Sequence, residues 1–213
     1  MQDNGGMTSA NAVRVMVYVD GFNLYNGLEE LRGHRYLWLD LQAVAETVVR
    51  PGQVLVGVRY FTARVRSDPP AEQRQAAYLT ALGTRPLVEV VEGRFQQKRR
   101  TCRTCGARWT TYEEKETDVS IAVALVEDGA NDAFDVALVL SADSDLCPGV
   151  RALKRLCPEK RVVAVFPPKR RSDDLRSAAD ATFTLGEANV RRSLLPRTVQ
   201  AGRITLTRPA KWS

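Results

Sequence analysis

Short apolar runs rich in β-branched residues recur along the chain, without strict alternation of apolar and polar positions. This pattern is typical of strands that are buried on both faces of a parallel sheet. Stretches with helical signals separate the runs, and most of them start after a capping residue or a proline. Because strands and helices alternate, we expect right-handed β-α-β crossovers and an α/β fold with a doubly wound sheet. The predicted strands are residues 13–19, 54–61, 87–95, 136–140, 161–166 and 182–185, and the predicted helices are residues 41–49, 69–82, 117–128, 146–156 and 173–180.

This alternation defines one predicted domain, residues 13–187, with appendages of different composition. Residues 1–12 are polar and contain glycine, so we predict a disordered start. Residues 96–112 break the pattern with a basic segment that holds two cysteines, and we predict a protruding hairpin insertion there. Residues 188–213 carry six basic and no acidic side chains, which equals the net charge of +6 of the whole chain. We therefore predict a basic tail on a neutral body, so that any affinity for phosphate must come from local clusters or from the tail.

The composition narrows the class of protein. Of 213 residues, 44% are hydrophobic and 26% are charged, which are the values of a globular protein. No apolar run approaches the ~18 residues of a membrane span, and the first residues lack the pattern of a secretory signal, so no membrane partner is expected. Four unevenly spaced cysteines do not resemble a disulfide framework and favour the cytoplasm. A single histidine, His34, argues against a Ser-His-Asp relay or a His-rich metal site.

Acidic residues follow two of the predicted strands. Asp20 comes directly after the first strand, and Asp143 and Asp145 come just after the fourth. Asp118 stands at the start of the helix that precedes the fourth strand. In an open parallel sheet, ligands bind outside the carboxyl ends of the strands, where the strand order reverses. If the first and fourth strands are neighbours, the four acids share one cleft.

Such a cluster is costly without a cation, since two carboxylates ~4 Å apart repel by about 4 kcal/mol at an effective dielectric constant of about 20. Oxygen ligands without nitrogen or sulfur favour Mg²⁺ or Mn²⁺, which activate water and neutralise charge on a phosphoryl group. In the alternative interpretation each acid is only a turn residue or an N-cap, and spacing alone does not separate the two. The pair Asp143 and Asp145 favours the metal site, because two like charges at one helix start exceed what a cap requires.

Three segments together resemble the NYN domain, a group of PIN-like nucleases that includes the bacterial LabA-like proteins. They are VDGFNLYNGL at residues 19–28, EKETDVSIAVALVEDG at 114–129 and LVLSADSDLCPGVRALKR at 138–155, in the order and spacing of the family. The resemblance covers residues 13–187 and includes PPKRRSDDLRSAAD at 167–180. It implies a PIN-like three-layer α/β/α sandwich with a central, mainly parallel sheet, and metal-dependent cleavage of RNA.

The resemblance also implies roles for single residues. Asn23 matches the Asn of the first motif and is expected to orient Asp20 or a bound water. Ser141 matches a small polar residue at the end of the fourth strand, whereas Glu116 has no firm counterpart. The acidic positions that would bind Mg²⁺ or Mn²⁺ fall on Asp20, Asp118, Asp143 and Asp145.

Basic residues map to the same predicted sheet edge and to the hairpin insertion. Phosphate oxygens need such donors around an acidic cleft, and an aromatic residue beside them, here Trp109, suits single-stranded RNA. The plainer interpretation is that these residues are solvated loop positions of an Arg-rich chain. The expected RNA-binding residues are Arg64, Arg66, Lys98, Arg99, Arg100, Arg103, Lys169, Arg170 and Arg171.

The sequence Cys102-x-x-Cys105-Gly has the form of a zinc knuckle but supplies two ligands only. Cys147 and Cys157 lie at the two ends of a predicted helix, about 15 Å apart along its axis, so both cannot complete the site. The remaining arrangements are a Zn²⁺ site shared between the chains of a homodimer, a site completed by water, a disulfide, or a metal-free hairpin tip.

The leading functional hypothesis is a metal-dependent endoribonuclease. The alternative is a non-catalytic RNA-binding or regulatory module on the same fold, although an RNA binder gains nothing from acids that face phosphates. A third hypothesis, a doubly wound enzyme that uses a nucleotide or flavin, lacks both the G-x-G-x-x-G turn after a first strand and a Walker loop.

Overall fold

A seven-stranded sheet forms the centre of the protein, with strand order β4-β3-β2-β1-β5-β6-β7. The computed structural model describes residues 12–66, 68–101 and 104–212, with the backbone alone for residues 94–100 and 109–115. The predicted disordered start therefore lies outside the described residues, apart from Ala12. Neighbouring strands are parallel except for β4, which is antiparallel to β3. The strands are β1 (Val13–Asp20), β2 (Gln53–Ala63), β3 (Val88–Thr101), β4 (Arg108–Lys115), β5 (Val136–Leu140), β6 (Arg161–Phe166) and β7 (Ala181–Thr184).

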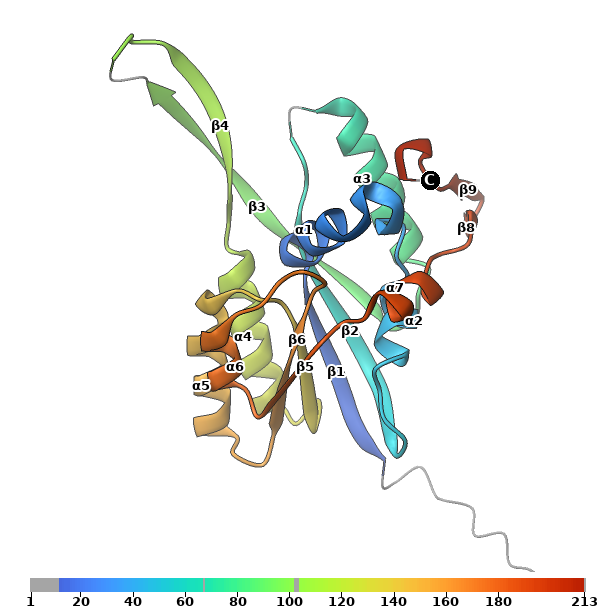
Figure 1. Cartoon of the computed structure of the whole chain (residues 1–213), viewed down its shortest axis with the longest axis vertical. Helices are drawn as coiled ribbons and strands as arrows, with labels where there is room; N and C mark the ends of the chain where they lie inside the picture. The colour runs from blue at the N-terminus through green and yellow to red at the C-terminus, as the bar shows by residue number, and fades with distance from the viewer. Residues whose placement is uncertain (1–11, 67, 102–103, 213) are drawn as a thin grey trace, which may run out of the picture.

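Helices cover both faces of this sheet, with α4, α5 and α6 on one side and α1, α2, α3 and α7 on the other (Figure 1). The predicted α/β/α sandwich with a mainly parallel sheet is confirmed. None of the described helices is long and apolar enough to cross a membrane. The helices are α1 (Gly21–Arg32), α2 (Leu41–Glu46), α3 (Pro69–Leu82), α4 (Thr117–Ala130), α5 (Cys147–Leu156), α6 (Asp173–Ala178) and α7 (Glu187–Arg192), with 3₁₀ turns η2 (Gly33–Tyr36), η3 (Ser144–Leu146) and η4 (Ala210–Trp212).

Strand β1 occupies the position where the strand order reverses, because it pairs with β2 on one side and with β5 on the other. Its side chains serve two cores. Val17 and Val19 pack in the core under α1 and α2, whereas Tyr18 packs in the core under α4 and α5. Burial on both faces explains why the sequence of this strand is apolar at successive positions.

Helix α1 is an element that the sequence pattern did not predict. It begins directly after β1, where Asp20 caps it by accepting a hydrogen bond from the backbone N–H of Asn23. Glycine and asparagine are poor helix formers, which conceals the helix in the sequence. Tertiary contacts require the glycines: a Cβ on Gly27 would lie 2.6 Å from the Pro168 carbonyl oxygen, and one on Gly21 would lie 2.6 Å from that of Phe61.

Strands β3 and β4 form a long antiparallel hairpin that projects beyond the helical layers (Figure 1). The pairing runs from Arg94 opposite Lys115 to Thr101 opposite Arg108. The hairpin arises at the predicted insertion, residues 96–112. Cys102 and Arg103, which belong to the predicted knuckle at its tip, lie outside the described residues.

The described residues of the predicted basic tail (188–213), which are residues 188–212, pack against the domain. They contribute most of α7, an antiparallel pair β8 (Thr198–Ala201) and β9 (Ile204–Thr207), and η4. The ring of Trp212 lies 6.3 Å from that of Trp38 and 6.0 Å from that of Tyr78, between centroids. The apolar residues that anchor the segment are too widely spaced to give a periodic signal; they are Val190, Leu195, Val199 and Trp212.

Candidate metal centre

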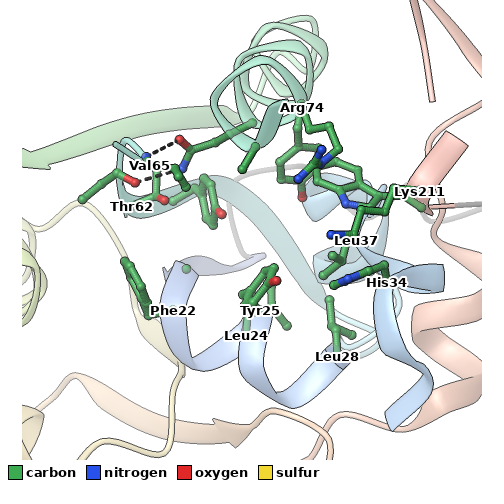
Figure 2. A pocket seen from close by; sticks show the side chains of 17 residues that line it. Phe22, Leu24, Tyr25, Leu28, His34, Leu37, Thr62, Val65, Arg74 and Lys211 are labelled. Carbon is green, nitrogen blue, oxygen red and sulfur yellow. Dashed lines mark hydrogen bonds between the residues drawn. The ribbon is translucent and has the colours of Figure 1, made fainter. Parts of the chain in front are cut away.

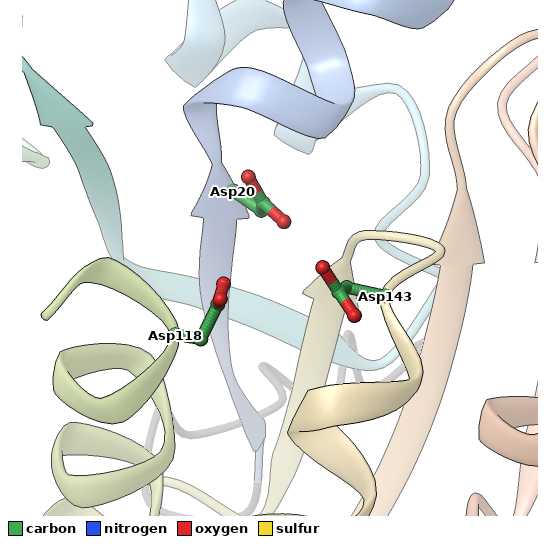
Figure 3. Close-up of side chains that lie close together, drawn as sticks. All are labelled: Asp20, Asp118 and Asp143. Atoms are coloured by element: carbon green, nitrogen blue, oxygen red, sulfur yellow. The ribbon is translucent and has the colours of Figure 1, made fainter. Parts of the chain in front are cut away.

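Three carboxylates converge at the carboxyl edge of the sheet (Figure 3). Asp20 ends β1, Asp143 follows β5, and Asp118 is the second residue of α4, which starts at the same edge. One carboxylate oxygen of each lies within 4.8 Å of those of the other two. Asp20 is 2% exposed, and the other two are half-buried. The geometry therefore fits a shared ion better than three independent caps.

Asp145, the fourth predicted acid, does not belong to this group of three. It lies in η3 and is exposed, and its backbone N–H donates to the Asp143 carboxylate at 2.9 Å. Its negative charge still acts on the cluster, because it is one of the charges that raise the pKa of Asp118. The structure thus brings together three of the four predicted acids, and a role for Asp145 as a ligand remains a prediction.

Asn23 and Ser141 hold the acids in place. The Asp20 carboxylate accepts hydrogen bonds from the Asn23 side-chain amide at 2.8 Å and from the Ser141 hydroxyl at 2.7 Å. The Ser141 hydroxyl oxygen also accepts a hydrogen bond from the backbone N–H of Asp143 at 3.0 Å, and the Asn23 side-chain oxygen Oδ1 accepts one from the backbone N–H of Ala142 at 3.3 Å. These bonds tie the end of β1 to the end of β5, so the two acids are positioned by one network.

The acids raise one another's affinity for protons. Burial, followed by the charges of Asp143, Asp20 and Asp145, raises the pKa of Asp118 to about 6. Burial is also the largest cause that raises the pKa of Asp20, and its hydrogen bonds from Asn23 and Ser141 oppose this shift. Among the side chains that the structure describes, no Lys or Arg forms an ion pair with the three acids. A cation is what would relieve this repulsion, and three oxygen donors suit a hard divalent ion.

The pKa of Asp118 gives a testable prediction for stability. The pKa of Asp118 in the folded protein is about 6, above the ordinary value of 3.8. Between these two pH values, the folded protein therefore binds a proton at Asp118 that the unfolded chain has largely lost. The free energy of unfolding therefore falls as pH rises from about 4 to about 6. In the presence of EDTA, Asp118→Asn should remove the share of that fall that Asp118 contributes and leave the share of Asp20, whose pKa is also raised. Above pH 6 it should stabilise the protein by about 1 kcal/mol, a value reduced for solvent screening, or ~2–4 °C in Tm.

Thermal unfolding measured from pH 4 to pH 8 checks this prediction. The matched control is Glu127→Gln, which removes one exposed charge near the other end of α4. It should leave the pH profile of the wild-type protein unchanged. Equal Tm values for Asp118→Asn and wild type at pH 7.5 in EDTA would contradict the prediction.

Glu116 adds a feature that the sequence did not signal. It stands between β4 and α4 with a left-handed backbone (φ 82°), a conformation that costs a residue with a Cβ atom about 1–3 kcal/mol. The turn redirects the chain from the hairpin into α4 and so places Asp118 at the cluster. Glycine or asparagine usually fills such positions, so nothing in the sequence marks this one.

The predicted RNA-binding residues divide into two groups. At the sheet edge, Arg64 forms a bidentate ion pair with Glu92 at 2.5 and 2.7 Å, and Arg170 pairs with Glu30 at 2.5 Å. The Arg171 guanidinium lies 3.2 Å from the Asp173 carboxylate. Arg66 and Lys169, which stand close to Arg64 and Arg170 in the sequence, are exposed. In the hairpin, the side chains of Lys98, Arg99 and Arg100, and all of Arg103, lie outside the described part of the chain.

Among the described residues, the three cysteines do not lie close to one another. Cys147 and Cys157 are buried at the two ends of α5, in the core under α4 and α6, and they are free thiols. Cys105 is exposed beyond β3, far along the hairpin. Because Cys102 lies outside the described residues, zinc binding by the Cys102–Cys105 pair remains a prediction.

The fold and the three acids define the class: an α/β/α sandwich protein with an acidic candidate metal centre where the strand order reverses. The chain belongs to the NYN domain family, whose model matches residues 14–186. NYN domains form part of the PIN-like nuclease superfamily, so the resemblance noted in the sequence is confirmed.

Two further proteins are similar to the chain. One is 6-hydroxy-3-succinoylpyridine 3-monooxygenase HspA of Pseudomonas putida, which is 26% identical over a match that covers 94% of this chain and 75% of that protein. The other is the crystal structure of a protein of unknown function from Vibrio parahaemolyticus. It superimposes with a TM-score of 0.56 at 19% identity and covers 89% of this chain and all of its own. That second likeness concerns the fold alone.

Proposed function

We propose that this protein is a divalent-metal-dependent endoribonuclease that hydrolyses RNA phosphodiester bonds at the cluster of Asp20, Asp118 and Asp143. The observation that carries the proposal is the approach of three carboxylate oxygens to within 4.8 Å, without an ion pair to any described Lys or Arg. A binding module has no need for acids at the place where phosphates must approach, because carboxylates repel them.

Three side chains would hold the ion, and the others would support them. A bound Mg²⁺ or Mn²⁺ supplies a polarised water and neutralises charge on the phosphoryl group. Asp20 is fixed by Asn23 and Ser141, so its oxygens keep their direction in the absence of substrate. A bound ion would favour the ionised form of Asp118, whose pKa is raised to about 6 by burial first and then by its acidic neighbours. Asp145, exposed on the open side, is proposed as a ligand of a bound water.

Basic side chains at the same edge would hold the RNA backbone. Arg64 and Arg66 follow β2, and Lys169, Arg170 and Arg171 follow β6, so they stand on two sides of the acids. Guanidinium groups bind phosphate oxygens in the same bidentate way in which Arg64 now binds Glu92. The proposal therefore includes an exchange of carboxylate partners for phosphate at Arg64 and Arg170.

Cleavage of an end-labelled single-stranded RNA tests the proposal. We expect shortened products with Mg²⁺ or Mn²⁺, no products in EDTA, and recovery when the metal is restored. Retained RNA binding without cleavage in either metal would instead support a non-catalytic RNA-binding module.

The name of the Pseudomonas relative points to another chemistry, the oxygenation of a pyridine compound. Oxygen uptake with 6-hydroxy-3-succinoylpyridine and a two-electron reductant separates the two activities, because a monooxygenase reduces one atom of dioxygen to water, whereas hydrolysis of RNA consumes water and no dioxygen. Uptake that depends on this compound, in a preparation that leaves RNA intact, would overturn the ribonuclease proposal.

A further inference from the structure

A second candidate site lies beside the acids along the same sheet edge. It is a pocket of about 320 Å³ between α1, α3, the end of β2 and η4 (Figure 2). Gly21 and Phe22, which line it, are the two residues that follow Asp20. Since β2 and β1 are neighbours, the pocket lies over one side of β1 and the acid cluster lies between β1 and β5. One RNA strand could therefore occupy both sites.

Aromatic rings form the walls of this pocket. Phe22 and Tyr25 project from α1 and are each 39% exposed, so they present ring surface to a ligand. Across from them, the rings of Tyr60, Tyr78 and Trp212 form an edge-to-face series with centroids 6.3 and 6.0 Å apart. These three rings are each 8% exposed and form the back of the pocket, so the exposed rings of Phe22 and Tyr25 are the ones that can stack on a planar heterocycle, whichever base is present.

The wall on the side of α3 is held rigidly. The Gln75 side chain donates to the Ala63 carbonyl oxygen at 2.9 Å and accepts the Val65 backbone N–H at 2.8 Å, which fixes the end of β2 to α3 (Figure 2). The Tyr78 hydroxyl donates to the Leu39 carbonyl oxygen at 2.8 Å. These polar groups are used within the protein, so the pocket offers a ligand mainly ring faces and apolar surface.

Cationic groups stand at one side of the pocket. Arg74 from α3 and Lys211 from η4 both line the cavity, on the side away from Phe22 in Figure 2. A pocket with aromatic walls and two cations at one side fits a planar ring that carries an anionic group. Its volume is at the lower end of the ~300–1,000 Å³ of ligand pockets, which suits a single base.

We infer that this pocket binds one unstacked base of a single-stranded RNA, next to the phosphate at the proposed metal centre, with Arg74 and Lys211 at a neighbouring phosphate. The inference rests on the proposed ribonuclease function and adds to it a requirement for unpaired RNA. Proteins commonly read single-stranded RNA by stacking splayed bases on aromatic side chains.

Binding can be measured apart from cleavage by using Asp143→Asn as the background. Fluorescence anisotropy of a labelled RNA oligomer in EDTA should show about tenfold weaker binding for Phe22→Ala and for Tyr25→Ala, the effect expected for one lost stacking contact. Ala71→Phe, which fills the pocket from α3, should weaken binding similarly. The matched control is Leu156→Ala, which removes an apolar side chain that is 62% exposed on α5, and it should bind as the background does.

Competition identifies the group that enters the pocket. A nucleoside monophosphate should displace the labelled RNA, whereas ribose 5-phosphate should not. Displacement by pyridine-3-carboxylate at lower concentration than by any nucleotide would show that the pocket takes small aromatic acids, and would overturn the inference.

Cleavage then gives an independent readout in the protein with its acids intact. In a set of RNAs with one abasic position each, we expect a single position near the cut at which loss of the base slows cleavage, and Ala71→Phe should abolish that dependence. If the cleavage rate depends neither on the abasic position nor on the pocket variants, the inference about the pocket is wrong, whereas the ribonuclease proposal still holds. If RNA binding depends on the pocket but no RNA is cleaved, the ribonuclease proposal is wrong, whereas the inference that the pocket binds a base still holds.

Discussion

RNA cleavage by Asp143→Asn is expected to fall at least about 100-fold, because the change removes one charged oxygen ligand from a site worth several kcal/mol to phosphoryl transfer. Folding should survive the change. The amide oxygen of the substituted side chain would still accept the backbone N–H of Asp145, as the Asp143 carboxylate does at 2.9 Å. Loss of one charge should also lower the pKa of Asp118, since Asp143 is the largest charge effect on it.

Single-turnover cleavage at saturating Mn²⁺, together with a thermal melt in EDTA, measures both effects. The variant should melt at or above the wild-type temperature while it fails to cut RNA. Glu159→Gln, which removes a charge that is 64% exposed and lies after α5, serves as the control and should cut at the wild-type rate. A normal cleavage rate in Asp143→Asn would show that the acid cluster is not the reaction centre.

Ser141→Ala should weaken metal binding and cleavage by about 10–100-fold, although Ser141 is not proposed as a metal ligand. Its hydroxyl is fully buried, donates to Asp20 at 2.7 Å and accepts the backbone N–H of Asp143 at 3.0 Å. Removal of the hydroxyl frees both acids to move apart and leaves the buried N–H without this acceptor, at a cost of about 1–3 kcal/mol in stability.

A positioning role and a merely structural role give different results here. Positioning predicts that the Mn²⁺ concentration for half-maximal cleavage rises in Ser141→Ala and recovers in part in Ser141→Cys, which keeps a weak donor. Ser177→Ala is the control, because the Ser177 hydroxyl is exposed and donates only to the Asp173 carbonyl oxygen one turn away. A lower Tm with an unchanged Mn²⁺ requirement would restrict Ser141 to a structural role.

Single strands and the acids at their ends can be predicted from short stretches of the sequence. The strand at residues 136–140 has the predicted bounds, because a β-branched apolar run buried on both faces carries its own signal. Asp20 and Asp143 could be placed at strand ends for the same reason. Their convergence then needed one topological assumption, that the first strand lies beside the strand at 136–140, and the pairing of β1 with β5 satisfies it.

Helix α1 shows where local signals fail. Its glycines and asparagines weaken the helical propensity, and those glycines are required by contacts with Phe61 and Pro168, which are distant in the sequence. The packing of the C-terminal residues could not be predicted for a related reason, since Trp212 packs against the rings of Tyr78 in α3 and Trp38 before α2, which are distant in the sequence. The aromatic pocket combines both segments, so no single stretch of sequence could indicate it.

The strand–helix order and the placement of acids at strand ends could be predicted from the sequence, because both depend on neighbours within a few residues. Which acids meet depends on how the whole domain packs. Asp118 reaches the cluster through the left-handed turn at Glu116, whereas Asp145, two residues from Asp143, faces solvent. The direction of a side chain at the start of a helix depends on how that helix packs on the sheet, and this packing is set by contacts across the whole domain.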